Sequence, residues 1–186
     1  MCGAICCSFK NPLETPLVFS WEKRKLEEID NQLIFKPWLS YRIGRNSYAV
    51  VLYRWIIYGN CPFLDTNNGK CEIHDIKPLS CKIFPLLIGI DDNTLRVSRA
   101  CIFVEKYSSK IFGSDPARVF PNEYPEAIKS YTILKIIDEI ARLNNWVRVV
   151  GDSVSGELVD IDEVLDVDQL VERVNNLLAE STEKNT

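Results

Sequence analysis

Seven cysteines are the residues of this chain best able to do chemistry, and all of them lie within the first 101 positions. Three lie near the start, three recur at intervals of ten, and one stands alone: Cys2, Cys6, Cys7, Cys61, Cys71, Cys81 and Cys101. Thiolates are preferred ligands of zinc, iron–sulfur clusters and other soft metals. The sequence therefore predicts a metal site whose ligands come from these seven side chains.

The spacing of the cysteines bears on the kind of metal. The C-x2-C pairs that hold most structural zinc ions are absent from the sequence. A 4Fe–4S cluster tolerates more varied spacing, because each cysteine binds a different iron. Adjacent Cys6 and Cys7 are expected to point in different directions, which suits two metal atoms better than one. We therefore expect an iron–sulfur cluster of the 4Fe–4S type, with zinc as the alternative.

Seven thiols exceed a four-ligand site, so either some of them pack around the ligands or more than one metal atom is bound. Lone Cys101 fits a buried, small apolar side chain as well as it fits a ligand. The single histidine, His74, lies between Cys71 and Cys81, where it could be a ligand or a proton carrier. No serine–histidine–aspartate set and no pair of carboxylates has a spacing that marks it as catalytic, so catalysis stays open.

The composition is that of one domain of ordinary size. The chain has 186 residues, of which 46% are hydrophobic, and it does not need disulfides to form a core. Its start shows no signal-peptide pattern, and its longest apolar-rich stretch, residues 48–58, is too short to cross a membrane and contains Arg54. We therefore expect a cytoplasmic protein without membrane association, in which reduced thiols bind metal rather than pair as disulfides.

Charge is distributed unevenly along the chain. The net charge is −4, but residues 151–186 carry −8 and residues 1–150 carry +4. An acidic segment of this kind suits contact with a protein partner, and a solvated acidic face explains it equally simply. The expected organisation is a cysteine-cluster region at 1–105, a helical extension of the same domain at 106–150, and an acidic strand and helix segment at 151–186.

Hydrophobic patterning predicts an α+β fold, a small domain organised by its cysteines with antiparallel strands and helices packed beside them. Strands are predicted where β-branched and aromatic residues gather: 33–43, 47–58, 71–74, 86–90, 94–104, 146–150 and 158–164. Helices are predicted at 21–31, 78–84, 124–144 and 167–178. Ser20 and Asp166 are the expected N-caps of the first and last helices. Cys101 is expected on the second strand of a hairpin that turns at residues 91–93.

The central cysteine string carries a family resemblance. Residues 61–85, CPFLDTNNGKCEIHDIKPLSCKIFP, resemble the signature of the YkgJ-type cysteine-cluster proteins, the CxxCxxCC family of zinc- or iron-chelating domains. The matching positions are Cys61, Pro62, Phe63, Leu64, Cys71, Ile73, Pro78, Cys81, Phe84 and Pro85. The resemblance covers about residues 1–105 and implies a metal or an iron–sulfur cluster held by cysteines. Lys77 and Lys82 stand where the family has arginines, so positive charge beside the thiolates is kept. His74 stands where the family has tyrosine, so the resemblance implies that it packs or hydrogen-bonds rather than binds metal.

Two further functions stay open. The family has a distant relative in flagellin lysine-N-methylase, which implies an S-adenosylmethionine-dependent protein-lysine methyltransferase, although the sequence shows no glycine-rich nucleotide fingerprint. The other is a nucleic-acid or ribonucleoprotein binding module, for which the mildly basic first 150 residues are weak support. Its candidate contacts are Arg42, Arg45, Arg54, Lys77, Lys82, Arg96 and Arg99.

Overall fold

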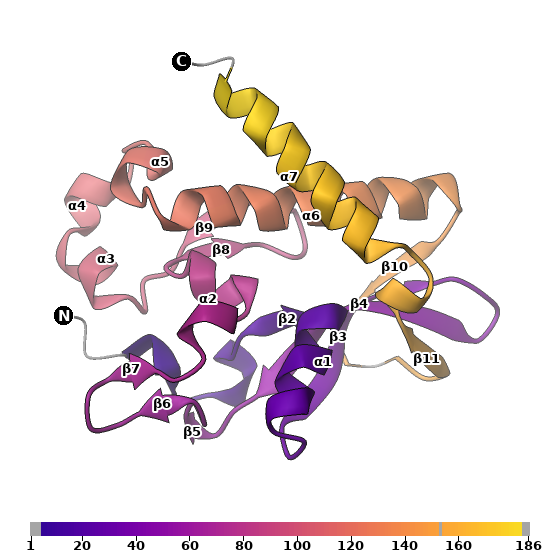
Figure 1. Ribbon diagram of the computed structural model, residues 1–186, viewed down its shortest axis with the longest axis horizontal. Coiled ribbons are helices and arrows are strands. Elements are labelled where there is room, and N and C mark those ends of the chain that lie inside the picture. The colour runs from indigo at the N-terminus through magenta and orange to yellow at the C-terminus, as the bar shows by residue number, and fades with distance from the viewer. Residues whose placement is uncertain (1–4, 153, 184–186) are drawn as a thin grey trace.

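A five-stranded sheet forms the centre of the computed structural model, which describes residues 5–152 and 154–183 (Figure 1). Its strands lie in the order β10 (Val147–Val150), β3 (Ile34–Arg42), β4 (Ser47–Ile56) and β11 (Glu157–Asp160), and β2 (Leu17–Phe19) also pairs with β4. All pairs are antiparallel except β11 with β4. The long β3–β4 hairpin therefore receives strands from both ends of the chain. The α+β fold class is confirmed.

Two irregularities in the β3–β4 pairing change which way the side chains point. Trp38 on β3 has no partner residue on β4, and Val51 on β4 has no partner residue on β3. A bulge of this kind breaks the alternation of side chains between the two faces. Val51 and Leu52, although adjacent, therefore both belong to the core cluster beneath the long helix, while Val50 and Tyr53 belong to the cluster on the opposite face.

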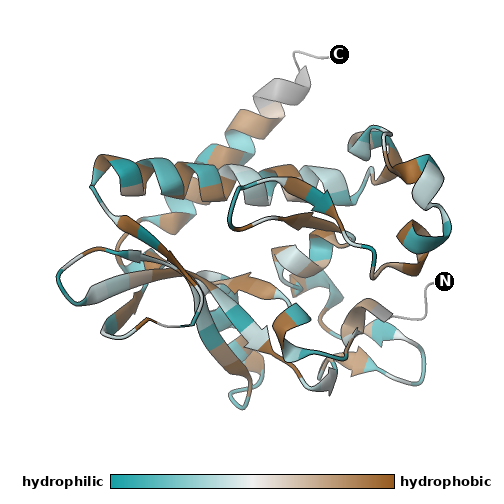
Figure 2. Ribbon diagram, turned by 180° about the vertical axis from the view of Figure 1, so that it is seen from behind, coloured by the Kyte–Doolittle hydropathy of each residue, from teal (hydrophilic) through white to brown (hydrophobic). Residues whose placement is uncertain are grey.

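Helices cover both faces of the sheet. The long helix α6 (Glu123–Leu143) and the C-terminal helix α7 (Val167–Glu183) lie over one face and cross each other, while α1 (Ser20–Ile29) packs on the other (Figure 1). Hydrophobic and hydrophilic bands alternate along α6 in Figure 2, as expected for a helix with one face in the core. Among the described helices, none is long and apolar enough to cross a bilayer.

The cysteine-bearing segments form small elements beside the sheet rather than within it. Two short ladders, β1 (Ser8–Phe9) with β5 (Gly59–Asn60) and β6 (Leu64–Asp65) with β7 (Lys70–Cys71), lie among short helical turns. Those turns are η1 (Ile5–Cys7), η2 (Pro12–Glu14), η3 (His74–Ile76) and the helix α2 (Leu79–Ile83). Short elements of this kind depend on contacts from elsewhere in the chain for their stability.

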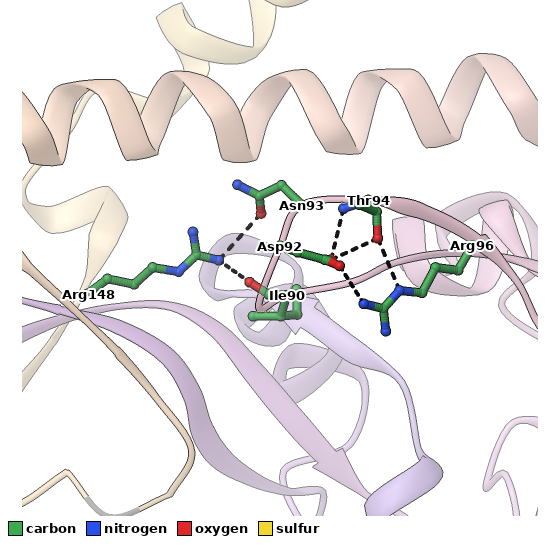
Figure 3. Close-up of polar contacts among 6 residues, drawn as sticks. All are labelled: Ile90, Asp92, Asn93, Thr94, Arg96 and Arg148. Carbon is green, nitrogen blue, oxygen red and sulfur yellow. Dashed lines mark hydrogen bonds and ion pairs between the residues drawn. The ribbon is translucent and has the colours of Figure 1, made fainter.

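The β8–β9 hairpin is tied to the sheet and to α6 by one arginine. The hairpin consists of β8 (Leu86–Ile88) and β9 (Leu95–Val97), and Arg148 of β10 points at the loop between them (Figure 3). Arg148 donates to the carbonyl oxygen of Ile90 and to Asp138 of α6, at 2.8 and 2.9 Å from the two carboxylate oxygens. Asn93 of the loop donates to the same carboxylate at 2.7 Å. The ion pair of Arg148 and Asp138 therefore joins β10 and α6 to the β8–β9 loop, which is remote from both in sequence.

The remaining helical turns close one end of the molecule. They are α3 (Ile102–Lys106), α4 (Ser108–Ile111) and α5 (Pro116–Val119), whereas η4 (Ile161–Glu163) lies apart from them, beside α1 and β4. The first three pack on a separate apolar cluster formed with α2, β8 and the start of α6, which contains Ile83, Leu86, Val104 and Phe120.

Most of the predicted elements are confirmed, and four are wrong in detail. The first helix includes Ser20, so Ser20 is not its N-cap: its hydroxyl donates to Asp162 at 2.5 Å, and Glu22 instead accepts from the amide of Phe19. The strand expected at 71–74 ends at Cys71 and becomes the turn η3. The strand expected at 158–164 ends at 160, and residues 161–163 form η4.

The fourth correction concerns Cys101. The hairpin at 86–97 is confirmed, but its second strand ends at Val97, and Cys101 precedes α3 instead of lying on a strand. In contrast, the predicted N-cap of the last helix is confirmed, since the carboxylate of Asp166 accepts from the amide of Gln169 at 2.9 Å.

Candidate metal centre

Five of the predicted cysteines come together in the structure: Cys6, Cys7, Cys61, Cys71 and Cys81. The sulfurs of Cys6 and Cys7 lie 3.9 Å apart. The other three are near enough to these two, or to each other, for their charges to interact. All five are free thiols, and they come from three short segments, residues 6–7, 61–71 and 81, of which the first is remote in sequence from the other two.

Backbone hydrogen bonds bring the first two segments together. The β1–β5 ladder aligns Ser8 with Asn60, and directly beyond it the amide of Cys61 donates to the carbonyl oxygen of Cys7 at 2.7 Å. The β6–β7 ladder then places Cys71 opposite Leu64. Main-chain pairing therefore fixes Cys7, Cys61 and Cys71 in one neighbourhood.

The third segment is positioned by α1. Pro78 is the N-cap of α2, and the amide of Cys81 in the first turn of that helix donates to the carbonyl oxygen of Pro78 at 2.9 Å. The amide of Leu79 lies at the start of α2, where it has no acceptor within the helix, and it donates to the carboxylate of Glu22 at 2.7 Å. Glu22 also accepts from the amide of Phe19 at 3.0 Å, so one carboxylate caps α1 and anchors the helix that carries Cys81.

The electrostatics of the group disfavour free thiolates. The pKa of Cys81 is raised to about 12, mainly by burial and also by the nearby charges of Cys61, Glu22 and Cys71, while Lys77 acts in the opposite direction. Burial also raises the pKa of Cys61, against a hydrogen bond that its sulfur accepts from the amide of Phe63. Thiols that oppose one another's ionisation release their protons readily only to a cation that binds the resulting thiolates.

The Cys6–Cys7 pair shares one hydrogen bond between its sulfurs. That bond is the main reason that the pKa of Cys6 is raised and the pKa of Cys7 is lowered. Lys77 acts in the direction of lowering the pKa of Cys6 as well as that of Cys81. The lysine therefore supplies the positive charge beside the thiols that the sequence predicted.

The donor set fits a soft metal. Five sulfurs, one backbone N–H donor to sulfur and one lysine are the groups that thiolate-bound zinc and iron–sulfur clusters use. Within residues 5–152 and 154–183, no group of three or more histidine, cysteine, aspartate or glutamate side chains is placed so that it could hold a metal ion as it stands. Which sulfurs are ligands therefore stays a prediction.

Two predicted cysteines fall outside this group. Cys2 lies outside the described residues. Cys101 is partly buried and packs on the apolar cluster that contains Ile83 and Val104, as expected if it serves as a small apolar side chain. His74 is exposed on η3, so it does not take the packing role expected from sequence.

Sequence reasoning missed Glu22. Its signal is present in the sequence, because a glutamate in the first turn of a helix often accepts a hydrogen bond from the amide that precedes the helix. Its second bond, to Leu79, has no local signal, since it depends on how α1 and α2 pack. The methyltransferase and nucleic-acid hypotheses stay predictions from sequence.

Comparison with known proteins supports the metal centre. No solved structure matches the chain. A family model described as CxxCxxCC, putative zinc- or iron-chelating domain, matches residues 1–113, which include all seven cysteines and the whole of the five-cysteine group. The chain therefore belongs to the CxxCxxCC family of zinc- or iron-chelating domains.

Proposed function

We propose that the chain binds a 4Fe–4S cluster through thiolates of the five-cysteine group, and that this cluster holds the cysteine-bearing segments together or carries electrons. The observation that supports this most directly is the convergence of five cysteines, two of which lie far in sequence from the other three. Four ligands suffice for one cluster, and the remaining thiols are then neighbours of the cluster.

The surroundings of the sulfurs support a cluster. The amide of Phe63 donates to the sulfur of Cys61, and Lys77 lies near Cys6 and Cys81. Hydrogen bonds to sulfur and nearby positive charge stabilise the negative charge of a thiolate-bound cluster and tune its reduction potential. The neighbours of the cysteines therefore suit either role, structural or electron-carrying.

A second candidate is a structural zinc ion, which one distance favours. Zinc–sulfur bonds of ~2.3 Å in a tetrahedron put two ligand sulfurs ~3.8 Å apart. The sulfurs of Cys6 and Cys7 are 3.9 Å apart, which suits one metal atom bound by both. The expectation that these adjacent cysteines point apart is not met.

The energetic weight of either metal is large for a domain of this size. Structural zinc contributes about 10–16 kcal/mol of apparent binding free energy at neutral pH, and a whole domain has a net stability of about 5–15 kcal/mol. The ladders that carry the cysteines are only two residues long on each strand. Metal binding is therefore expected to supply much of the stability of these segments.

Anaerobic purification followed by an absorption spectrum and metal analysis tests the proposal. A brown protein with about four irons and four sulfides per chain supports the 4Fe–4S cluster. A colourless protein with one or two zinc ions supports the second candidate. A metal-free protein that gains neither metal on reconstitution under reducing conditions contradicts both.

Serine substitutions within the same experiment identify the ligands. Cys61→Ser, Cys71→Ser and Cys81→Ser are expected to lower the metal content, because each removes a sulfur of the group. Cys101→Ser is the matched control, since Cys101 packs on a separate apolar cluster. Metal content that falls with Cys101→Ser and not with the other three contradicts the assignment of the site.

A further inference from the structure

A cavity of about 750 Å³ lies between the sheet and the layer formed by α2, the β8–β9 hairpin and α6. Figure 1 shows how α2 stands between α6 and the sheet at this place. The walls are mostly apolar and include Phe9, Leu17, Phe19, Leu52, Ile83 and Leu134. Small-molecule sites have volumes of about 300–1,000 Å³ and walls of this kind, with few polar groups. Cys6 lies in the wall, so the cavity borders the five-cysteine group.

One wall of the cavity holds a buried arginine. Arg54 of β4 is only 8% exposed. Its terminal nitrogen donates to the carbonyl oxygens of Leu13 and Thr15, and its guanidinium stacks on the ring of Trp38 at 3.9 Å from the ring centre. Its Nε is buried and has no hydrogen-bond partner among the described residues. A buried charge is costly unless an opposite charge and hydrogen bonds compensate it.

The counter-charge of Arg54 is absent from the described part of the chain, where no carboxylate forms an ion pair with it. Asp152 lines a small neighbouring cavity together with Arg54 but makes no ion pair. Burial lowers the pKa of Arg54, which is the direction expected for a cation without a compensating anion. Lys10 and Glu14 also lie in the wall, but both are exposed and their charges oppose each other.

The bulge in β4 explains why Arg54 reaches this cavity. Arg54 and Leu52, two residues apart on one strand, both line it. With regular alternation along the whole strand, Leu52 and Arg54 would both lie on the face opposite Val51. The bulge instead puts Leu52 on the same face as Val51, and Arg54, two residues further on, follows Leu52 to that face. Bulges commonly redirect a side chain next to a functional site.

A second polar group without a partner lies in the same wall. The hydroxyl oxygen of Ser80 is buried and has no hydrogen-bond partner among the described residues. Ser80 belongs to α2 and precedes Cys81, whereas Arg54 belongs to the sheet. Arg54 and Ser80 therefore both line this apolar cavity, and each has a buried polar atom without a partner among the described residues. A buried polar atom without a partner calls for an explanation in a native protein.

We propose that this cavity binds a small organic acid, whose carboxylate pairs with Arg54 and whose hydrocarbon body occupies the apolar space beside the sheet and α6. The carboxylate supplies the missing counter-charge, and the hydroxyl of Ser80 offers a further hydrogen bond to a polar atom of the ligand. The site is a property of the fold and does not depend on which metal the cysteines bind.

Titration calorimetry with sodium decanoate, using the full chain with its metal content measured on the same sample, tests the proposal. Saturable binding of one decanoate per chain is expected. Decanol, which has the same hydrocarbon body without the charge, is expected to bind about tenfold more weakly or worse, because a charged hydrogen-bonded pair is lost. Equal affinity for decanol, or no saturable binding of decanoate, overturns the proposal.

Variants separate the charge from the cavity. Arg54→Met is expected to weaken decanoate binding about tenfold or more and to leave decanol binding unchanged, whereas Arg54→Lys keeps part of the affinity. Arg118→Met, at a side chain 89% exposed, is the matched control and is expected to change neither. Unchanged decanoate affinity in a folded Arg54→Met protein overturns the proposal.

A variant on the opposite wall keeps the test decisive if Arg54→Met does not fold. Ser130 of α6 lines the cavity and is buried, so Ser130→Phe places a ring in the space while Arg54 stays in place. It is expected to abolish the binding of both decanoate and decanol. If the Ser130→Phe variant binds decanoate as tightly as the unsubstituted protein does, decanoate does not bind in this cavity and the proposal is wrong.

Discussion

The amide of Cys61 donates a hydrogen bond to the carbonyl oxygen of Cys7 at 2.7 Å. This bond continues the two-residue ladder between β1 and β5, and it joins two cysteines that the sequence places far apart. A ladder this short is only marginally stable alone. The metal proposed for the neighbouring sulfurs and the backbone pairing therefore support each other.

Metal removal is expected to loosen the cysteine-bearing segments before the rest of the fold. After treatment with a chelator, amide hydrogens of residues 6–9, 59–72 and 79–83 should exchange faster, while those in the middle of α6 keep their protection. The reason is that each ladder has only two residues on each strand and α2 has five residues, whereas α6 has 21 residues and packs in the large core cluster. Hydrogen exchange measured by mass spectrometry checks this, and equal loosening of α6 or an unchanged 59–72 segment would contradict it.

Glu22→Ala is expected to destabilise the protein by about 1–3 kcal/mol, because the amides of Phe19 and Leu79 both lose their acceptor. Metal content should fall as well, since α2 carries Cys81 and is anchored by the bond to Leu79. Denaturant unfolding and metal analysis measure the two effects. Glu28→Ala, at an exposed position of the same helix, is the control and should change neither.

Asp138→Asn is expected to lower the free energy of unfolding by about 1–3 kcal/mol. Asp138 accepts from Tyr41, Asn93 and Arg148, and its side chain is 26% exposed. An asparagine cannot accept from all three and cannot pair with the charge of Arg148.

Glu139→Gln is the matched control for Asp138→Asn. Glu139 is adjacent on α6 and pairs with Arg142, but its side chain is 55% exposed. Exposed ion pairs contribute little, so the change in unfolding free energy should stay within about 0.5 kcal/mol. Denaturant unfolding of the two variants side by side checks the prediction. Equal losses of unfolding free energy in the two variants would contradict a special role for Asp138 in holding the β8–β9 hairpin.

Stability is expected to fall in alkali, and Tyr53 is one cause. Its hydroxyl donates to Asp160 at 2.5 Å, and burial, followed by that bond, raises its pKa well above the usual value. A tyrosine in the unfolded chain titrates near pH ~10. The native state therefore keeps a proton that the unfolded state loses, so the stabilising contribution is complete below pH ~10 and decreases as the pH rises above it.

Tyr53→Phe tests this dependence. The variant should be less stable than the unsubstituted protein at pH 8, because Asp160 loses a donor, and the difference should shrink as the pH rises above ~10. Unfolding by denaturant at several pH values measures both trends. Tyr58→Phe, at a side chain 75% exposed, should show no such convergence. A constant difference between Tyr53→Phe and the unsubstituted protein at all pH values would exclude this role for Tyr53.

The sequence by itself determined the elements whose pattern is local. The gathering of β-branched and aromatic residues at 34–42 and 47–56, the helical period of 123–143 and the carboxylate cap at Asp166 each depend on neighbours within a few positions. The cysteine motifs likewise identify the family, because they are a property of spacing alone. Such patterns can be recognised from sequence because the conformational preference of each residue depends mainly on its own turn or strand.

Only the tertiary structure decided which cysteines meet and which polar groups are buried. Cys101 packs on a separate apolar cluster, and the hydroxyl of Ser20, the expected cap, donates instead to Asp162, which lies 142 residues along the chain. Arg54 lines the cavity because a bulge interrupts β4, and neither the bulge nor the lack of an ion pair for Arg54 among the described residues has a local sequence signal. The physical reason is that these contacts join segments remote in sequence, so their energies depend on how the sheet, α1, α2 and α6 pack together.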